Sequence, residues 1–567
     1  MEALSLLSTI KVNFKVWLLL LLIFLIGHIY GQEKAEQVYL TLCDRMGIEV
    51  EKPFNFQPLN TGKCGFGLYV EVGRNWDKFN EIQKTNIKKA LERPQLQTSI
   101  LTRSGRFRIH FDTTGVNEPF LIDDLGNRIP NSWRGYVDSV ARYIDSVYKV
   151  QVEIFGFEFN FNDESMGGGP EYDIYILNLP EGLYGETVFD PLNPLPKLGK
   201  AQRYLSFMRI DNSYSKSSFY TQGISALKVT LAHEFNHAVQ LLSYGLWEDN
   251  IWFYEMTSTW LEEALFDEVD DYYQYIPRFF KNTRTPIYQH DGYDLAVLGI
   301  FFQSRFTHKL MVNAWGFIRN EPPLVALELA LNDFNSTLKR EFVEFSLWNY
   351  YTGKRANPRY YKEGENYPEV RFETQPVFLT SNEATVRNSA GALSAQYYMF
   401  VWRNDTIVAI ISNVNLQYAF LRSSDEFEFE YHITTSSGND YTPLGNGLRA
   451  KLKVNDFDNW GSLNILNSQV SLVKERDVFP NPFYADGIEK VLIPVESEFD
   501  EIDLKIFTAG LDLVYSAKVK PEFNFGNYFV SWNGRNSSGE IVKSGVYIYI
   551  LVADGKEKIG KFVLIRK

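Results

Sequence analysis

The residues best suited to chemistry lie at positions 233 to 237, which read His-Glu-Phe-Asn-His. The apolar flanks, with Gly245 as a stop, predict a helix. On that helix His233 and His237 are one turn apart and project on the same side, so both imidazoles can bind one metal ion. Glu234 lies beside them and can polarise a water that the metal holds. Two histidines satisfied within a packed helix are the alternative.

A catalytic zinc ion needs a third protein ligand and an open position for water. Glu255 follows His237 after 17 residues, which is enough for a turn and a returning helix. Glu262 lies about two helical turns further on and shares the face of Glu255, so facing alone does not choose between them. Glu263 points about 80° away. For Glu262 and Glu263 we favour surface carboxylates on an exposed face.

The second helix opens with Trp252-Phe253-Tyr254-Glu255 and continues with small residues to Trp260. This resembles the gluzincin metallopeptidases, in which His-Glu-x-x-His is followed by a Glu on a helix that often reads Trp-x-x-Glu. The resemblance implies that Glu255 is the third zinc ligand. Thr259 departs from the Asp or Ser that some gluzincins place four residues after that Glu. The wider region, from Arg108 to about Phe302, looks like a predicted family of exported bacterial metallopeptidases.

A gluzincin also needs a group that stabilises the oxyanion, commonly Tyr or His. Residues 288–298 offer three candidates, Tyr288, His290 and Tyr293. Tyr293 begins an apolar helix, much as the catalytic Tyr does in the aminopeptidase branch of the gluzincins, so we rank it above His290. A packed aromatic side chain or a surface histidine is the alternative for each.

Together these residues predict an exported zinc-dependent endopeptidase that hydrolyses peptide bonds of a protein or peptide substrate. Zn²⁺ would be held by His233, His237 and Glu255, with Glu234 as the general base and Tyr293 at the oxyanion. Aminopeptidase action is a third possibility. It would need a group that holds the free amine of the substrate, and we see no Gly-x-Met-x-Asn stretch of the kind that aminopeptidase gluzincins carry for this purpose. The alternative from another class is a surface adhesin or binding protein with a structural or vestigial metal site. The presence of Glu234 argues against that alternative, because a purely structural metal site has no use for a carboxylate beside its ligands.

The elements that must position this site lie in a long mixed region. Residues 107–111 and 172–177 alternate or run apolar as strands do, and residues 133–150 carry apolar positions at helical spacing. We expect a multidomain chain with an α+β zincin-like catalytic domain at residues 105–374. All-β sandwich modules follow it, the last of them Ig-like.

Two loops in this region bear on cofactors. Asp123, Asp124 and Asn127 could offer oxygens to Ca²⁺, but a solvated turn is the favoured interpretation. Three glycines at 167–169 lack the Lys-Ser/Thr of a phosphate-binding loop, and we interpret them as a flexible loop.

The N-terminus predicts export. Lys11 and Lys15 precede an apolar core of 12 residues, which suits a signal peptide over residues 1–32 better than a membrane helix. A single N-terminal anchor that is never cleaved is the alternative. Residues 33–104 are polar and partly helical, and form either a pro-segment or an N-terminal layer of the next domain. In an oxidising compartment Cys43 and Cys64 could pair, or remain two buried free thiols.

The C-terminal third predicts two β modules. In residues 375–476 the hydrophobic period changes to two, as at 426–431, which indicates a β-sandwich. Residues 477–567 resemble the type IX secretion sorting domain and the related Ig-like fold of flagellar hook-capping proteins. An ordinary terminal Ig-like module is the alternative. The segments that carry the resemblance are Phe479-Pro480-Asn481-Pro482-Phe483, Leu504-Lys505-Ile506-Phe507, Trp532-Asn533-Gly534-Arg535-Asn536, Gly539, Ser544-Gly545-Val546-Tyr547 and a basic ending.

Composition limits the remaining classes. With 45% hydrophobic and 22% charged residues, the chain of 567 residues has ample material for packed cores. A net charge of −13 argues against nucleic-acid binding. After the signal peptide no apolar run is long enough to span a membrane, so the mature protein is expected to be secreted or on the cell surface. The sorting resemblance implies the outer-membrane secretion machinery as a partner.

Overall fold

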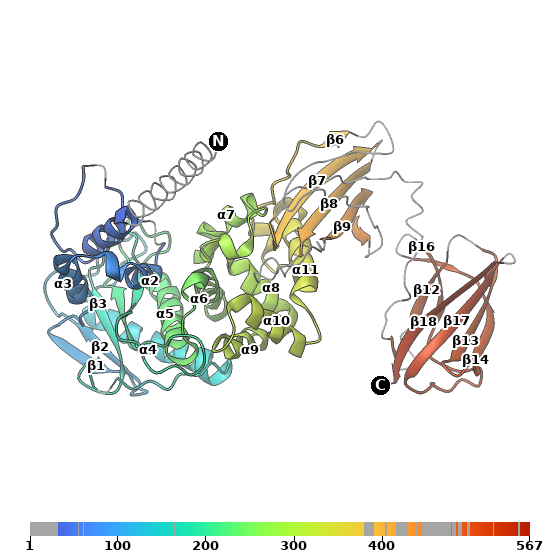
Figure 1. Cartoon of the computed structure of the whole chain (residues 1–567), viewed down its shortest axis with the longest axis horizontal. Helices are drawn as coiled ribbons and strands as arrows, with labels where there is room; N and C mark the ends of the chain where they lie inside the picture. Colours follow the sequence, from blue (N-terminus) through green and yellow to red (C-terminus); the bar gives the residue numbers. More distant parts are fainter. Residues whose placement is uncertain are drawn as a thin grey trace, which may run out of the picture. The chain divides into compact units, whose positions relative to one another are not determined.

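The chain is described here by a computed structural model (Figure 1). It describes residues 32–54, 56–59, 62–163, 165–378, 391–402, 405–414, 429–437, 440–444, 478, 483–485, 490–495, 499–524, 527–553 and 556–566. The predicted signal peptide, apart from Gln32, and residues 426–428 and 479–482 of the predicted β modules lie outside these ranges. Within them, every helix is too short or too polar to cross a lipid bilayer.

The described chain forms two compact units. The first holds the described residues up to Arg371, together with Ala392–Ser394 and Val414, and the second holds the others. The first unit is mixed α/β and the second is β-rich. The sheet order in the described part of the first unit is β1-β2-β3-β5-β4, with β2, β3 and β5 parallel and the edge strands antiparallel to their neighbours. Its strands are β1 Thr98–Leu101, β2 Phe107–Phe111, β3 Tyr172–Leu177, β4 Gly185–Phe189 and β5 Ser206–Asp211.

The bounds of β2 and β3 confirm the two strands predicted from the sequence. Strands β3, β4 and β5 are buried almost throughout, because helices cover the sheet. One of these helices is α4, Trp133–Tyr148, which continues as a π-helical turn to Ile154 and so confirms the helix predicted at 133–150.

Helix α5, Gly223–Val239, packs on strands β4 and β5 and carries the His-Glu-x-x-His sequence. It runs on as a π-helical turn, Gln240–Tyr244, and stops at Gly245 with φ of 88°. A side chain at Gly245 would also collide with Ala201, because its Cβ would lie 2.8 Å from the Ala201 Cβ. The predicted stop is therefore confirmed, and glycine is required there.

Helix α6, Ile251–Leu265, packs against α5 and confirms the returning helix predicted after the histidines. On its other side α6 packs on α8, so α5 and α6 lie between the sheet and a second group of helices (Figure 1). That group contains α7 Ile276–Lys281, α8 Ala296–Phe306, α9 Lys309–Ile318, α10 Pro323–Asp333 and α11 Leu338–Tyr350.

The N-terminal segment belongs to the same compact unit as the sheet. It contains a helix at residues 32–45, then α2, Phe66–Arg74, and α3, Glu81–Ala90. Helix α2 is fixed to the sheet because the Tyr69 hydroxyl donates to Glu186 Oε2 over 2.8 Å. Cys43 and Cys64 are both buried free thiols, so they do not form a disulfide.

The second unit contains the described residues of the C-terminal module and, apart from Ala392–Ser394 and Val414, those of the module predicted at 375–476. Where the sequence predicted a sandwich at 375–476, the described residues form one sheet of order β10-β9-β8-β7-β6. Its strands are β6 Val377–Phe378, β7 Ser394–Trp402, β8 Asp405–Asn413, β9 Phe429–Ser437 and β10 Asp440–Leu444.

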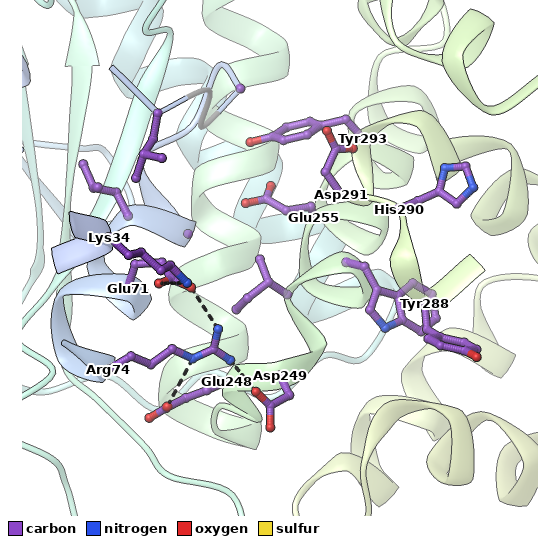
Figure 2. Close-up of a pocket in the computed structure, with 16 residues that line it drawn as sticks. Lys34, Glu71, Arg74, Glu248, Asp249, Glu255, Tyr288, His290, Asp291 and Tyr293 are labelled. Atoms are coloured by element: carbon purple, nitrogen blue, oxygen red, sulfur yellow. Dashed lines mark hydrogen bonds and ion pairs between the residues drawn. The ribbon is translucent and has the colours of Figure 1, made fainter. Parts of the chain in front are cut away.

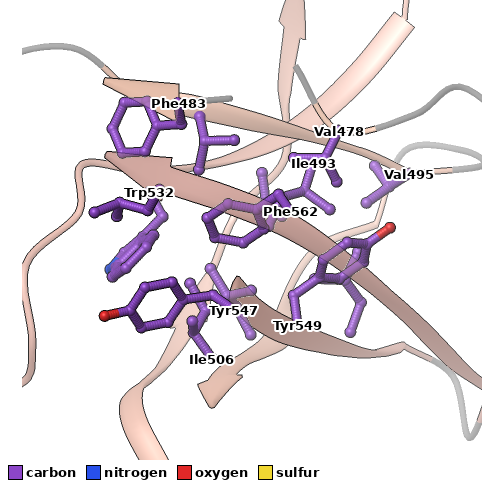
Figure 3. Close-up of a cluster of buried hydrophobic side chains, with 14 of the residues drawn as sticks. Val478, Phe483, Ile493, Val495, Ile506, Trp532, Tyr547, Tyr549 and Phe562 are labelled. Carbon is purple, nitrogen blue, oxygen red and sulfur yellow. The ribbon is translucent and has the colours of Figure 1, made fainter. Parts of the chain in front are cut away.

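The C-terminal module contains two sheets that share one core (Figure 3). Trp532 from one sheet meets Tyr547 and Phe562 from the other, with ring centroids 5.9 and 5.8 Å away. The first sheet, of order β11-β18-β17-β13-β14, contains β11 Phe483–Ala485, β13 Ile502–Thr508, β14 Leu513–Val519, β17 Gly545–Ala553 and β18 Lys556–Arg566. The second, of order β12-β16-β15, contains β12 Val491–Val495, β15 Glu522–Asn524 and β16 Asn527–Trp532.

Candidate metal centre

Four buried side chains of the first unit converge between α5, α6 and the start of α2. They are Cys64, His233, His237 and Glu255, and their ligand-type atoms all lie within 4.8 Å of one another. The structure therefore brings the three metal ligands predicted from the sequence together and adds a cysteine to them.

The spacing of the nitrogen and oxygen atoms fits one small cation. His233 Nε2 lies 3.1 Å from His237 Nε2 and 3.1 Å from Glu255 Oε2, and His237 Nε2 lies 3.4 Å from the same oxygen. A tetrahedral zinc ion with bonds near 2.0–2.2 Å separates its ligands by about 3.3 Å. Three donor atoms are thus already at the separations that a single tetrahedral ion imposes.

The outer nitrogen of each imidazole is held by another side chain. His233 Nδ1 lies 2.7 Å from Glu262 Oε1, and His237 Nδ1 lies 2.8 Å from Gln240 Oε1. When Nδ1–H donates to these oxygens, each ring presents the lone pair of Nε2 to the shared point. Gln240 is fixed in turn because its amide donates to the backbone oxygen of Tyr254.

The prediction that Glu262 is a surface carboxylate is wrong. Helix α6 is buried from Trp252 to Glu262, because α5 and α8 cover it, and Glu262 is only 1% exposed. Its second oxygen lies 2.5 Å from the buried Lys63 ammonium, which also lies 2.5 Å from Asp271 Oδ2. Glu255 and Glu262 share a face, as expected, and meet opposite nitrogens of His233.

Glu263 is also less exposed than predicted. One of its oxygens is buried and has no hydrogen-bond partner within the described part of the chain. Burial and, to a smaller extent, the nearby Glu363 and Asp267 carboxylates together raise the pKa of Glu263 to about 9. The side chain lies beside those two carboxylates, away from the two histidines.

The charges of the centre are mutually dependent. Burial raises the pKa of Glu255, but His237 and His233 more than offset this and lower it to about 2. For His233 burial lowers the pKa, while Glu255 and Glu262 raise it to about 9. The site thus favours a positive charge between carboxylate and imidazoles, and a divalent cation could replace that proton.

Glu234 lies at the edge of the cluster. Its carboxylate accepts a hydrogen bond from Thr187 Oγ1 over 2.8 Å, and its Oε2 lies 3.5 Å from Cys64 Sγ. Burial raises the pKa of Glu234. A buried carboxylate with a raised pKa, next to a metal-binding cluster, is suited to taking and returning a proton.

Tyr293 covers the other side of His233, with the two rings parallel at 5.8 Å and 4°. Its hydroxyl is buried and has no hydrogen-bond partner within the described residues. Burial also raises its pKa well above the usual value, so the phenol stays protonated. The Tyr293 hydroxyl is therefore free to donate a hydrogen bond to a bound substrate.

A cavity of about 430 Å³ opens beside Tyr293 and Glu255 (Figure 2). Tyr288 and His290 also line this cavity, and Figure 2 shows the side chains of Tyr293 and Glu255 pointing to one side and the ring of His290 pointing to the other. His290 Nδ1 is bound by Asp294 over 2.8 Å, which occupies that nitrogen. The Nε2 atom of His290, like the Tyr293 hydroxyl, is buried and has no hydrogen-bond partner within the described residues, and of the two side chains Tyr293 is the one that stacks on His233.

The other predicted loops have structural partners. Asp123 accepts hydrogen bonds from the backbone N–H groups of Leu125 and Asn127, and these bonds, that of Asn127 first, lower its pKa. This is the turn that the sequence favoured at 123–127. Gly167 packs against Asp173, whose carboxylate a Cβ at Gly167 would overlap.

Sequence reasoning missed Lys63 and Gln240, and considered Cys64 as a disulfide partner or a buried free thiol but not as a metal ligand. Gln240 was detectable, because a residue three positions after His237 on a helix lies beside it. Lys63 and Cys64 contact residues of the centre that lie 199 and 170 positions away in the sequence, and no local pattern predicts such contacts.

Comparison with protein-family models finds no match, and no curated protein matches the chain. Among solved structures, PorZ of Porphyromonas gingivalis, an essential bacterial surface component of its type-IX secretion system, matches at 18% identity over 31% of each chain, with a TM-score of 0.14. Dimeric latent PorU of the same organism matches at 12% identity over 29% of this chain and 12% of that chain, with a TM-score of 0.15. The chain thus spans less than a third of either protein, and TM-scores this low establish no shared fold.

Proposed function

We propose that this chain is an exported zinc-dependent endopeptidase with a zincin-like catalytic domain. The observation that carries the proposal is the arrangement of both imidazoles. Glu262 and Gln240 hold the Nδ1 atoms, and the Nε2 atoms converge with Glu255 Oε2 at the spacing of one tetrahedral ion. Two nitrogens and one carboxylate oxygen form a donor set that suits catalytic zinc.

When bound, zinc would lower the pKa of a water and polarise the scissile carbonyl. Glu234 would take a proton from the attacking water at its carboxylate and return it to the leaving amine, for which a raised pKa is suited. The Tyr293 hydroxyl, a buried donor with no partner among the described residues, would donate to the oxyanion.

A peptide substrate is supported by strand β4. It is an edge strand of the sheet and packs against α5, the helix that carries Glu234. An edge strand offers unpaired backbone N–H and C=O groups, to which an extended peptide adds as a further strand. A substrate bound in this way would pass directly beside the catalytic glutamate.

The C-terminal module supports the proposal of export by type IX sorting. Its two sheets enclose one buried core, and strand β18 exposes Lys561 and Arg566. A cationic terminal strand is suited to a sorting receptor of opposite charge.

The proposed function is tested by metal analysis and casein digestion. The wild type should contain one zinc per chain, and His233→Ala or His237→Ala should remove it. Glu234→Gln should keep the metal and abolish digestion, whereas Glu181→Gln, at an exposed glutamate, should change neither. Because Cys64 adjoins the metal cluster, digestion is compared in both the wild-type and the Cys64→Ala background. Full zinc in the histidine variants, or digestion that survives Glu234→Gln, would overturn the proposal.

A second candidate is a surface binding protein with a structural zinc site. The proximity of Cys64 favours it, because structural zinc sites have four protein ligands and no open position. In that case Glu234→Gln would change no activity in either background, and loss of the metal would lower the melting temperature.

A further inference from the structure

Residues 62–66 of the N-terminal segment run directly across the candidate metal centre. Lys63 is 4% exposed, and Cys64 and Phe66 are fully buried. A Cβ at Gly62 would lie 2.6 Å from the Tyr293 ring, so this backbone rests against that ring. Phe66 stacks on the His237 imidazole, with centroids 4.2 Å apart and an interplanar angle of 2°.

The same residues occupy the edge of β4. The N–H of Tyr184 donates to the carbonyl oxygen of Lys63 over 2.9 Å, and Cys64 forms a parallel bridge with Gly185. This is the edge along which a peptide substrate would add. The segment therefore lies in the place of the substrate backbone.

The sulfur of Cys64 points into the metal cluster. It lies with the donor atoms of His233, His237 and Glu255 inside one 4.8 Å set, and the backbone N–H of Phe66 donates to it over 3.3 Å. Burial, and then the nearby Glu234 and Glu255, raise the pKa of the Cys64 thiol well above its usual value, so a metal ion would displace the thiol proton when it binds the sulfur. Thiolate sulfur is also a preferred zinc ligand.

We propose that Cys64 is the fourth ligand of the metal ion and that residues 62–66 keep the enzyme latent. This inference rests on the proposed function. The sulfur takes the position that a catalytic zinc site keeps open for water, and the backbone takes the substrate edge. Displacing the segment removes the sulfur as a thiolate, which takes a proton from solvent, and opens that position without electron transfer.

The anchors of the segment set how it is released. Lys63 forms buried ion pairs with Glu262 and Asp271, so the segment also stabilises the carboxylate that orients His233. Once the metal–sulfur bond is absent, the segment keeps these ion pairs, the contacts of Lys63 with the Tyr184 and Tyr275 rings, the stacking of Phe66 and the backbone contacts with β4, but it loses its bond to the metal ion. Removing the thiol should therefore let the segment open without removing the three other ligands.

The chain contains a matched control. Cys43 lies in the same N-terminal segment and is equally buried, but it is outside the metal cluster and close to Tyr39. Cys43→Ala removes one buried thiol with no expected effect on the centre.

The first test is the spectrum of the cobalt-substituted full-length protein. A thiolate bound to Co²⁺ gives a charge-transfer band in the near ultraviolet. The band should be present in the wild type and in Cys43→Ala, and absent from Cys64→Ala. Its absence from the wild type would overturn the ligand assignment, and this part of the test needs only the wild-type protein.

The second test is casein digestion by the zinc-loaded proteins. Cys64→Ala should digest casein about tenfold faster than the wild type or more, which corresponds to a change of about 1.4 kcal/mol in the barrier. Cys43→Ala should match the wild type. Equal rates in Cys64→Ala and the wild type would overturn latency while leaving the peptidase intact. A Cys64→Ala protein that loses zinc and digests nothing would favour the structural site, and a wild type without metal would overturn the proposed function itself.

Discussion

At the residue scale, the centre depends on Glu255 and Glu262, which contact different nitrogens of the His233 imidazole. Glu255 meets the inner nitrogen of His233 and Glu262 the outer one, at 3.1 and 2.7 Å. Their separation of seven residues, about two helical turns, places both on one face of α6, and the ring of His233 spans the distance between them. One carboxylate therefore can bind the metal while the other orients the ring.

The first prediction separates these roles. Glu255→Gln should abolish tight zinc binding, because a neutral amide is a poor zinc ligand. Glu262→Gln should retain zinc with an affinity lowered about 10–100-fold, since only the orientation of His233 is weakened. Zinc dissociation constants from chelator competition measure both. Equal losses in the two variants would show that Glu262 binds the metal directly.

The second prediction concerns Glu263, whose pKa of about 9 lies above its ordinary value of 4.5 because of burial and then of Glu363 and Asp267. The native state therefore holds a proton that the unfolded chain releases, and this contribution to stability is lost as pH rises from about 4.5 to about 9. Glu263→Gln, neutral at every pH, should show a smaller fall in melting temperature between pH 5 and pH 9.

Glu268→Gln is the control for this titration. The pKa of Glu268 is lowered, chiefly by its hydrogen bond with Lys228, so the group keeps its charge over the same pH range. Its removal should leave the fall in melting temperature as in the wild type. A fall in Glu263→Gln as large as in the wild type would show that Glu263 is ionised in the native protein.

At the scale of elements, the site depends on how closely α6 is held between α5 and α8. Gly299 of α8 faces Trp260 of α6, and a Cβ there would lie 2.5 Å from the Trp260 Cβ. Helices that meet at a glycine approach more closely than side chains otherwise permit. The position of Glu255 on α6 therefore depends on a residue without a side chain on α8.

The third prediction tests this contact. Gly299→Ala should destabilise the fold by about 1–3 kcal/mol, because overpacking pushes α8 from α6. Gly316→Ala is the control, since Gly316 lies on α9 with nothing within 4 Å of a Cβ. Alanine there should stabilise by about 0.5–1 kcal/mol through helix propensity. Denaturant titrations followed by tryptophan fluorescence measure both variants, and no loss in Gly299→Ala would contradict the close contact.

The elements also show what a sequence can and cannot predict. Strands β2 and β3 and helices α4, α5 and α6 follow from hydrophobic period and from the stop at Gly245, which are local signals. The burial of Glu262 was not predicted, because it depends on α8 covering α6. The approach of Cys64 to α5 was not predicted either, because it is a tertiary contact with no periodic signature.

At the scale of the whole molecule, the metal centre and the C-terminal module belong to different compact units. The buried core of the module is drawn from residues between Val478 and Leu564, so the module has a core of its own (Figure 3). A segment with its own core can be removed without exposing the core of the unit that carries the site. The architecture therefore permits a sorting module that is discarded after export.

The last prediction follows from this independence. If the module directs type IX sorting, the secreted protein should begin near Gln32 and end before Val478. Val478 is 4% exposed within the module's core, so a cut that releases the folded module must precede it. Peptide mapping of material from the culture medium of a bacterium with type IX secretion tests both ends.

The charge of strand β18 is tested by reversing it at two exposed residues. Lys561→Glu combined with Arg566→Glu should lower the amount of protein released, because the strand would no longer carry the positive charge that suits a receptor of opposite charge. Lys505→Glu, at an exposed lysine on β13, should not. Secreted protein that retains the Lys/Arg ending would instead assign the module an ordinary structural role.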